Sequence, residues 1–273
     1  MIDMHNHILF GVDDGPETIE ESIKLIKEAS NKGVTHIVFT PHFNKRNYSL
    51  NHDKVSINFQ ILKRAIKEEN IIIEVYLGNE VYLDSVGYTS IVENGFNTLA
   101  DSKYILVEFN EILPPSNIPE ICYELTINRY IPIIAHAERY EILHNNRKQL
   151  KEILDEGAHL QINASSILNK ENKERNKFAH FLLKNEIVSF VASDVHNSTS
   201  RKFYLDEAYN AVCKICSKTY ADNIFKLNQL NIINNSKLDR PKLPAKRKFL
   251  SKFRHSRWII TSIMLQLVLI LIY

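Results

Sequence analysis

Histidine and carboxylate side chains stand in closely spaced pairs at distant places in the chain. His5 and His7 form a His-x-His pair at its start, and Asp194 and His196 form an Asp-x-His pair further on. Because side chains on a strand alternate with a period of two, each pair points to one face of a strand. Imidazole and carboxylate ligands together suit divalent ions such as Mn²⁺, Fe²⁺ or Zn²⁺. The spacing therefore predicts a metal site built from segments far apart in the chain.

Side chains of the same kind follow most of the other apolar runs. They are His42, Glu80, Glu108 and His136. In a barrel of alternating strands and helices, functional groups lie at the carboxyl ends of the strands and in the loops that follow. A single histidine in such a place is more often a hydrogen-bonded structural residue than a ligand. Six strand ends that all carry such groups favour one shared metal centre over unconnected structural roles.

Acidic side chains would crowd the mouth of such a barrel and repel one another and an anionic substrate. They are Asp3, Asp13, Asp14, Glu80, Glu108, Glu111 and Asp194. Bound cations remove both problems. Two arginines, Arg139 and Arg201, closely follow ligand loops, and a guanidinium fork matches phosphate oxygens. The alternative is that both arginines pair with neighbouring acids such as Glu138. We predict a metal-dependent phosphohydrolase.

Other chemistries lack their sequence signatures. The chain has no Cys-x₅-Arg spacing of thiol phosphatases and no glycine-rich phosphate loop. Cys213 and Cys216 have a metal-like spacing, but they lie in a predicted helix without a partner pair, which favours a packing role. The cysteine content and the start of the chain, which lacks a secretory signal, indicate a reducing, cytoplasmic compartment. No basic groove with interleaved aromatic residues indicates nucleic-acid binding.

The elements that position these groups alternate between apolar runs and amphipathic stretches. The apolar runs predict seven buried parallel strands, over residues 2–5, 35–39, 72–77, 104–109, 131–135, 159–162 and 187–192. Helices are predicted over residues 18–31, 53–69, 118–128, 147–156, 172–185 and 201–218, the first opening with a Thr18-x-x-Glu21 capping box. Repeated βα units without a composition break favour one α/β barrel over two domains.

The C-terminal part differs in composition from the rest. Residues 237–257 hold nine of the 34 basic residues and one of the 32 acidic residues, so the rest of the chain is mildly acidic. Residues 258–273 carry no charge. A helix of this length spans about 24 Å, short of a hydrocarbon core of about 30 Å. A membrane anchor on the cytoplasmic side, an apolar helix packed elsewhere and an oligomer contact stay open.

Five segments of the chain resemble one known family in order and spacing. They are residues 1–15, Thr40-Pro41-His42, Gly78-Asn79-Glu80-Val81, residues 135–140 (AHAERY) and residues 192–196 (ASDVH). These segments resemble PHP-domain (polymerase and histidinol phosphatase) proteins, specifically the CpsB/YwqE-type bacterial protein tyrosine phosphatases of capsular polysaccharide clusters. The similarity covers roughly residues 1 to 230, and the Gly-Val-Asp-Asp-Gly loop at residues 11–15 is its most specific piece.

The resemblance implies a distorted (β/α)₇ TIM-like barrel (PHP fold) that holds up to three divalent metals, commonly Mn²⁺. The barrel would cover residues 1–236, followed by a basic linker (237–257) and an apolar tail (258–273). Carried over by position, one metal takes His5, His7, Glu80 and Asp194. A second takes Glu80, Glu108 and His136, and a third takes His42, His196 and Asp14. Arg139 and Arg201 correspond to the family's phosphate-binding arginines.

The implied activity is hydrolysis of phosphotyrosine on an autophosphorylated bacterial tyrosine kinase, which regulates capsular or exopolysaccharide biosynthesis. We expect in-line attack by a hydroxide that two metals share. The catalytic residues would be Arg139, Arg201, His136 and Asp194. Two alternatives stay open: a small-molecule phosphatase of histidinol-phosphate type, and a metal-binding regulatory module without catalysis.

Overall fold

Seven parallel strands follow one another in chain order around a barrel. The computed structural model describes residues 1–43, 52–83 and 95–244; Met1–Leu243 form one compact unit, to which the following applies. The strands are β1 (Ile2–Asp3), β2 (His36–Phe39), β4 (Glu74–Leu77), β6 (Tyr104–Glu108), β7 (Ile131–Ile134), β8 (His159–Asn163) and β9 (Phe190–Ala192). All seven predicted strands are confirmed, with ends that differ by up to three residues.

Two short strands continue β2 and β4 past a break. They are β3 (His42–Phe43) and β5 (Glu80–Tyr82), and they pair in parallel with each other. Hydrogen bonding therefore divides the strands into the sheets β1-β2-β4 and β3-β5-β6-β7-β8-β9. Between the last and first strands, the Asp194 N–H donates to the His5 carbonyl and the His7 N–H to the Val195 carbonyl, both at 2.9 Å. These bonds close the ring at its carboxyl end and confirm the predicted distorted (β/α)₇ barrel.

Alternation along each strand separates two apolar layers. Tyr104 and Leu106 of β6, and Phe190 and Ala192 of β9, belong to the inner cluster, while their neighbours pack against the surrounding helices. Two residues beyond the last inner apolar side chain stand Glu108 and Asp194. Because the period of a strand is two, these carboxylates continue the inner row at its carboxyl end.

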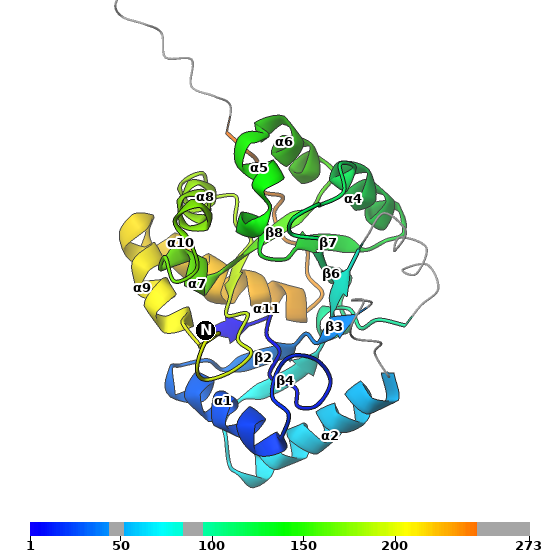
Figure 1. Ribbon diagram of the computed structural model, residues 1–273, viewed down its shortest axis with the longest axis vertical. Coiled ribbons are helices and arrows are strands. Elements are labelled where there is room, and N and C mark those ends of the chain that lie inside the picture. The colour runs from blue at the N-terminus through cyan, green and yellow to red at the C-terminus, as the bar shows by residue number, and fades with distance from the viewer. Residues whose placement is uncertain (44–51, 84–94, 245–273) are drawn as a thin grey trace, which may run out of the picture. The chain divides into compact units, whose positions relative to one another are not determined.

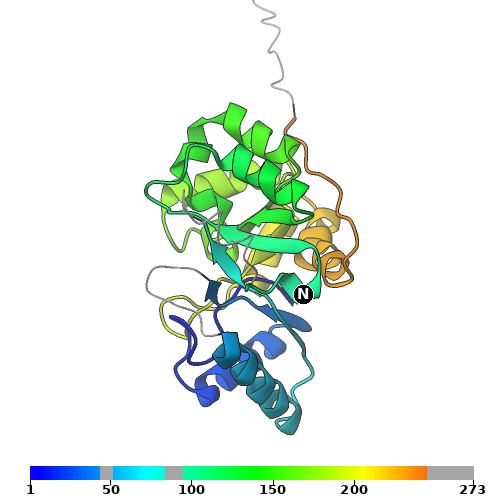
Figure 2. The same ribbon diagram turned by 90° about the vertical axis from the view of Figure 1, so that its right-hand side faces the viewer.

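Helices surround the strands on the outside (Figure 1 and Figure 2). They are α1 (Ile19–Asn31), α2 (His52–Glu68), α4 (Ile118–Ile127), α5 (Glu141–Asn145), α6 (Arg147–Asp155), α7 (Ala164–Ile167), α8 (Lys173–Lys184), α9 (Leu205–Ile215), α10 (Lys218–Asp222) and α11 (Asn228–Ile233). The predicted capping box of α1 is present: Thr18 and Glu21 each accept the other's backbone N–H, at 3.4 and 3.3 Å. Figure 1 shows α1 and α2 beside the β1-β2-β4 sheet and α4 to α8 around β6, β7 and β8.

The predicted helix over residues 201–218 is wrong at both ends. Residues 197–201 form a turn in which the Asn197 side chain accepts the backbone N–H of Arg201 at 3.2 Å. The Arg201 side chain reaches into the barrel mouth instead of lying on a helix, and α9 begins only at Leu205. At the other end, Cys216 leaves helical geometry and Ser217 caps a separate helix, α10.

The region after α10 closes the amino-terminal end of the barrel. The sequence indicated only a change of composition here, but Asn223–Leu227 form a π-helical turn that leads into α11. Ile232 and Leu238 are buried in the inner cluster. The Tyr104 hydroxyl, at the start of β6, donates to the Ser236 carbonyl (2.9 Å) and accepts the Leu238 N–H (2.8 Å).

The predicted apolar tail, residues 258–273, lies outside the described residues, as does most of the basic segment. Among the helices that the structure describes, none has the length and apolar character needed to cross a membrane.

Folding stability should fall below neutral pH through His159 of β8. This side chain is buried and its Nδ1 lies 2.8 Å from the Ser189 hydroxyl. Burial, helped by Arg240, lowers the pKa of His159 to about 4. The unfolded chain then binds the proton first as the pH falls, so the neutral form's contribution to stability is lost between about pH 6.5 and pH 4.

The His159 effect can be isolated by urea unfolding of wild type and His159→Gln in chelator, which keeps metal release out of the comparison. Between pH 7 and pH 5 we expect wild type to lose about 2 kcal/mol more than the variant. Equal losses in the two proteins would show that His159 does not titrate in this way.

Candidate metal centre

The carboxyl end of the barrel brings all nine predicted ligands together. They come from the ends of β1, β7 and β9, from β3, β5 and β6, and from the loop between β1 and α1: His5, His7, Asp14, His42, Glu80, Glu108, His136, Asp194 and His196. Eight of these side chains are buried, and only Asp14 is exposed, by 36%. The pairs predicted from spacing therefore lie at one site.

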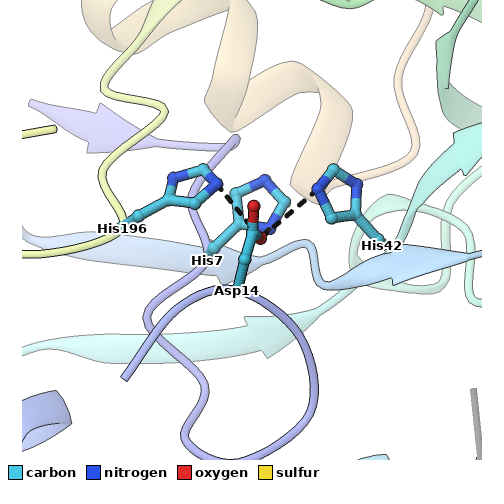
Figure 3. Close-up of side chains that lie close together, drawn as sticks. All are labelled: His7, Asp14, His42 and His196. Carbon is cyan, nitrogen blue, oxygen red and sulfur yellow. Dashed lines mark ion pairs between the residues drawn. The ribbon is translucent and has the colours of Figure 1, made fainter. Parts of the chain in front are cut away.

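The first group of ligand atoms surrounds Asp14 (Figure 3). Its Oδ1 lies 3.3 Å from His196 Nε2, 3.4 Å from His42 Nε2 and 3.8 Å from His7 Nδ1. The His7 ring lies between the other two, with its centroid 4.0 Å from that of His196 and 4.3 Å from that of His42. One oxygen and three ring nitrogens thus converge within 4.8 Å of one another.

The second group is centred on Glu80. His5 Nε2 lies 3.1 Å from Glu80 Oε1, and His7 Nε2 lies 3.3 Å from Glu80 Oε2. Both ring nitrogens also lie 3.7 Å from Asp194 Oδ1. The converging group is thus His5, His7 and Glu80, and Asp194, which the resemblance places on the same metal, lies beside it.

The third group shares Glu80 with the second. His42 Nδ1 lies 2.9 Å from Glu80 Oε2 and 3.1 Å from Glu108 Oε1. His136 Nε2 approaches the other oxygens of the same two carboxylates, at 2.9 and 3.8 Å. The expected groups contained no histidine in common, whereas here His7 belongs to two groups and His42 to two.

Hydrogen bonds fix which ring nitrogen faces the centre. His7 Nδ1 lies 2.6 Å from Asp13 Oδ2, and His5 Nδ1 lies 2.9 Å from Gln161 Oε1. In both rings Nε2 is left facing Glu80. Such outer partners orient metal-binding histidines in proteins generally. Gln161 also accepts the His136 N–H at 2.7 Å, and Asn163 donates to Asp194 at 2.7 Å.

Gln161 and Asn163 were missed in the sequence because an amide is not a typical metal ligand. A signal existed, since they stand two residues apart at the end of β8, the strand end for which no ligand was predicted. The amides at that end hold ligands from other strands.

Gly15 allows the acidic loop to approach the first strand. A Cβ atom at this position would lie 1.8 Å from the His7 carbonyl oxygen, so no larger residue fits without moving the loop. Asp13 accepts the backbone N–H groups of Gly15 and His42, both at 3.1 Å. The Gly-Val-Asp-Asp-Gly loop therefore delivers Asp14 to the centre and Asp13 to the His7 ring.

Two of the candidate ligands have left-handed backbone conformations. The φ angle is 32° at His136 and 51° at Asp194. Such residues are strained by about 1–3 kcal/mol and persist where surrounding contacts hold them. Here the His136 N–H donates to Gln161 and the Asp194 N–H to the His5 carbonyl. Strain at two strand ends of one site is typical of functional positions.

Both predicted arginines contact Asp194. An Nη of Arg201 donates to its carboxylate at 2.7 Å, and Arg139 Nη2 lies 3.1 Å from it. Arg139 also donates to Glu171 through Nε (3.2 Å) and Nη2 (3.1 Å). Both arginines therefore pair with acids, as the alternative expected, but the acids are Asp194 and Glu171 and not Glu138. Glu138 accepts the Asn163 N–H instead, and burial raises its pKa to about 7.

The electrostatics of the centre fit bound cations. Burial lowers the pKa of His5, but Glu80 and Asp194 outweigh it and raise this pKa to about 9. The pKa of Glu80 lies well below its usual value in spite of burial, because His5 and His42 oppose the charge. The pKa values of His7 and His42 are raised as well, whereas burial lowers those of His136 and His196, so protons on some of the rings offset part of the carboxylate charge. His5 Nε2 and His7 Nε2 are buried and make no hydrogen bond of ordinary geometry with described residues, so a metal that displaces a proton there can be coordinated.

The centre opens into a cavity of about 520 Å³. Its lining includes ligands and both arginines, as well as residues 109–112 after β6. A larger groove of about 620 Å³ lies between α1 and α2, but none of the nine ligands lines it. Since convergent polar groups mark a binding site better than volume does, we assign the substrate site to the smaller cavity. It can hold an anion between cations and guanidinium groups.

Two known tyrosine phosphatases are similar in sequence to this chain over most of its length. Tyrosine-protein phosphatase CpsB of Streptococcus agalactiae is 35% identical over 240 residues, which cover 86% of this chain and 99% of that protein. Tyrosine-protein phosphatase YwqE of Bacillus subtilis is 30% identical over 253 residues, covering 93% and 100%.

Solved structures of other proteins are similar to this chain as well. Among those of YwqE from Bacillus subtilis and CpsB from Streptococcus pneumoniae, described as unique metal-dependent tyrosine phosphatases, one chain matches with a TM-score of 0.83 and 30% identity, covering 90% of this chain and all of that one. Histidinol phosphate phosphatase of Lactococcus lactis shares the fold, with a TM-score of 0.54 at 19% identity. The family described as capsular polysaccharide synthesis, CpsB/CapC, matches residues 1–234. The chain belongs to this CpsB/CapC family.

Proposed function

We propose that this chain is a metal-dependent protein tyrosine phosphatase that hydrolyses phosphotyrosine. The observation that carries the proposal is the cavity in which Arg139 and Arg201 face three adjoining ligand groups. The names of its relatives in the CpsB/CapC family support the same activity. Histidinol phosphate phosphatase shares only the fold at 19% identity, so the small-molecule alternative gains no support from it.

We assign the nine converging side chains as ligands of up to three divalent ions, with Mn²⁺ as the proposed metal. Their mixed imidazole and carboxylate character suits Mn²⁺, Fe²⁺ or Zn²⁺. When bound, such ions supply Lewis acidity and lower the pKa of a coordinated water. Glu80, which contacts His5, His7, His42 and His136, would join two of the ligand groups.

The arginines would bind the phosphate group. Their guanidinium groups lie beside Asp194, and a fork of two N–H donors fits two phosphate oxygens. In this position they neutralise charge that develops on the oxygens during hydrolysis. His136 and Asp194 act beside them, as ligands in strained backbone positions. A phenol has a pKa near about 10, far below an alkyl alcohol, so protonation of a tyrosine leaving group is less demanding.

The substrate would be a tyrosine-phosphorylated protein of capsule synthesis, and in particular the phosphotyrosine tail of a bacterial tyrosine kinase. Membership of a capsular polysaccharide synthesis family supports this partner. We further propose that residues 258–273, after the basic segment 237–257, contact a membrane and keep the enzyme near such a kinase.

The proposed activity requires bound metal. Protein supplied with Mn²⁺ should hydrolyse a phosphotyrosyl peptide, and complete removal of metal should lower turnover by at least about a hundredfold, because several kcal/mol of charge stabilisation are lost. Adding Mn²⁺ back should restore it. Phosphate release is measured in parallel with histidinol phosphate. Preference for histidinol phosphate would favour the alternative activity, and full turnover without metal would disprove both.

Replacing Glu80 should remove metal from two groups at once. Glu80→Gln keeps the side-chain shape but loses the charge that neighbouring histidines face. Elemental analysis of protein purified without chelator should show a larger loss of metal than in Asp14→Asn, which affects only the first group. Glu120→Gln, on the exposed side of α4, is the matched control and should retain all metal. An unchanged metal content in Glu80→Gln would contradict the assignment.

Glu171 should act on substrate binding through Arg139. Glu171→Gln weakens a pair of charge-assisted bonds that position Arg139, so we expect kcat/KM for a phosphotyrosyl peptide to fall about tenfold, because Arg139 would contact the phosphate in the bound state and in the transition state. Metal content should be unchanged. Glu174→Gln is the control, since this exposed carboxylate contacts only Lys177 among described side chains. An unchanged kcat/KM would argue against a role in holding Arg139.

A further inference from the structure

Two large apolar side chains are exposed immediately beside the metal centre. Ile112 is 87% exposed and Leu113 is 79% exposed, and they follow β6, whose last residue is Glu108. Of the large apolar side chains that the structure describes, only Ile72 is more exposed than Ile112. Adjacent exposed apolar residues at the edge of a polar cavity are typical of a recognition surface.

Ile112 lies on the boundary between two cavities. It lines the cavity of the metal centre together with Arg139 and Arg201. It also lines a neighbouring cavity of about 580 Å³, whose apolar wall includes Leu113 and Ile142. Since Arg139 lines both as well, a ligand with its phosphate at the arginines passes Ile112 as it leaves the first cavity.

The rim segment, which we define as residues 110–114, is held in place. Asn110 Oδ1 accepts the backbone N–H groups of Ile112 (3.0 Å) and Leu113 (2.9 Å). Glu111 forms an ion pair with Arg175 of α8. Arg175 Nη1 in turn donates to Glu171 at 2.7 Å, and Glu171 is the partner of Arg139. One chain of ion pairs therefore connects the apolar rim to a guanidinium group of the centre.

We propose that the rim segment is the substrate-recognition surface: Ile112 packs against the tyrosyl ring of a phosphotyrosyl peptide, and Leu113 packs against an apolar residue beside it. The proposal rests on the tyrosine phosphatase function and specifies how its substrate is chosen. Continuity with the phosphate-binding cavity identifies the occupant as substrate. An aryl phosphate held at Arg139 places its ring at the exit lined by Ile112, and the peptide continues along the second cavity.

The test compares Ile112→Ala with wild type on a phosphotyrosyl peptide that carries leucine next to the phosphotyrosine. We expect KM to rise about tenfold, as for the loss of most of a buried aliphatic contact, while kcat stays within about twofold. The inhibition constant of inorganic phosphate, which has no ring, should not change. Ile72→Ala removes an equally exposed isoleucine that lines neither cavity and should leave KM unchanged.

A double-mutant cycle tests whether the ion pair between Glu111 and Arg175 positions the rim segment. Glu111→Gln removes the ion pair that holds the rim segment to Arg175, so we expect KM to rise about threefold in wild type and clearly less in the Ile112→Ala background. Additive effects would show that Glu111 does not act through Ile112.

Several outcomes separate the possible failures. An unchanged peptide KM in Ile112→Ala, with wild type active on phosphotyrosine, overturns only the proposed recognition surface. Absence of any phosphotyrosine hydrolysis by metal-loaded wild type overturns the function itself. Sedimentation of wild type and Ile112→Ala tests the other possible occupant of the rim segment, a second copy of the chain. A dimer that dissociates in Ile112→Ala would show that the rim segment binds that second copy.

Discussion

Negative charge concentrated at one end of the barrel is the constraint on which the rest of the structure depends. Five carboxylates, from Asp13, Asp14, Glu80, Glu108 and Asp194, meet around a cluster of histidine rings. Burying like charges together is unfavourable by several kcal/mol per ion unless opposite charge is close by. Two arginines supply part of it, and the carboxylates Glu80 and Asp194 raise the pKa of His5, which favours a proton on that ring. Divalent cations would replace such protons.

The barrel meets this constraint by separating packing from chemistry along each strand. Apolar side chains fill the inner layer along the strands, and the next inward-facing position at the carboxyl end carries a charged group. Leu106 and Glu108 of β6 are an example. Gly78, two residues before Glu80, allows the chain to pass close to Leu99, since a Cβ at Gly78 would lie 2.9 Å from the Leu99 side chain. The close approach at Gly15 brings in the acidic loop in the same way. The site is thus built on strand ends held by a packed interior, which limits how far the ligands can move apart.

Opposite charges also alternate outward from the centre. Asp194 contacts Arg139, and Arg139 pairs with Glu171. Glu171 also accepts a hydrogen bond from Arg175, and Arg175 pairs with Glu111. Along this row each buried charge has an opposite neighbour, so no member is left without compensation. Arg139 and the rim segment are therefore both linked to α8 through Arg175. If they bind substrate as proposed, phosphate binding and ring recognition are connected on one side of the mouth.

The seven strands and eight of the nine converging candidate ligands were predictable from the residues, because side-chain alternation and buried apolar runs are local properties of each segment. Asp14, in the loop after β1, was expected as a ligand only from the resemblance to PHP-domain proteins. How the ligands divide into groups was not predictable. His7 and His42 each face two groups only because strands distant in sequence close into a ring, and the short strands β3 and β5 pair with each other beyond β2 and β4. The outer partner Glu171 has no distinguishing spacing, and Gln161 has only its two-residue separation from Asn163 at the end of β8. Their roles arise from the position of a neighbouring strand or helix, and long-range packing alone decides it.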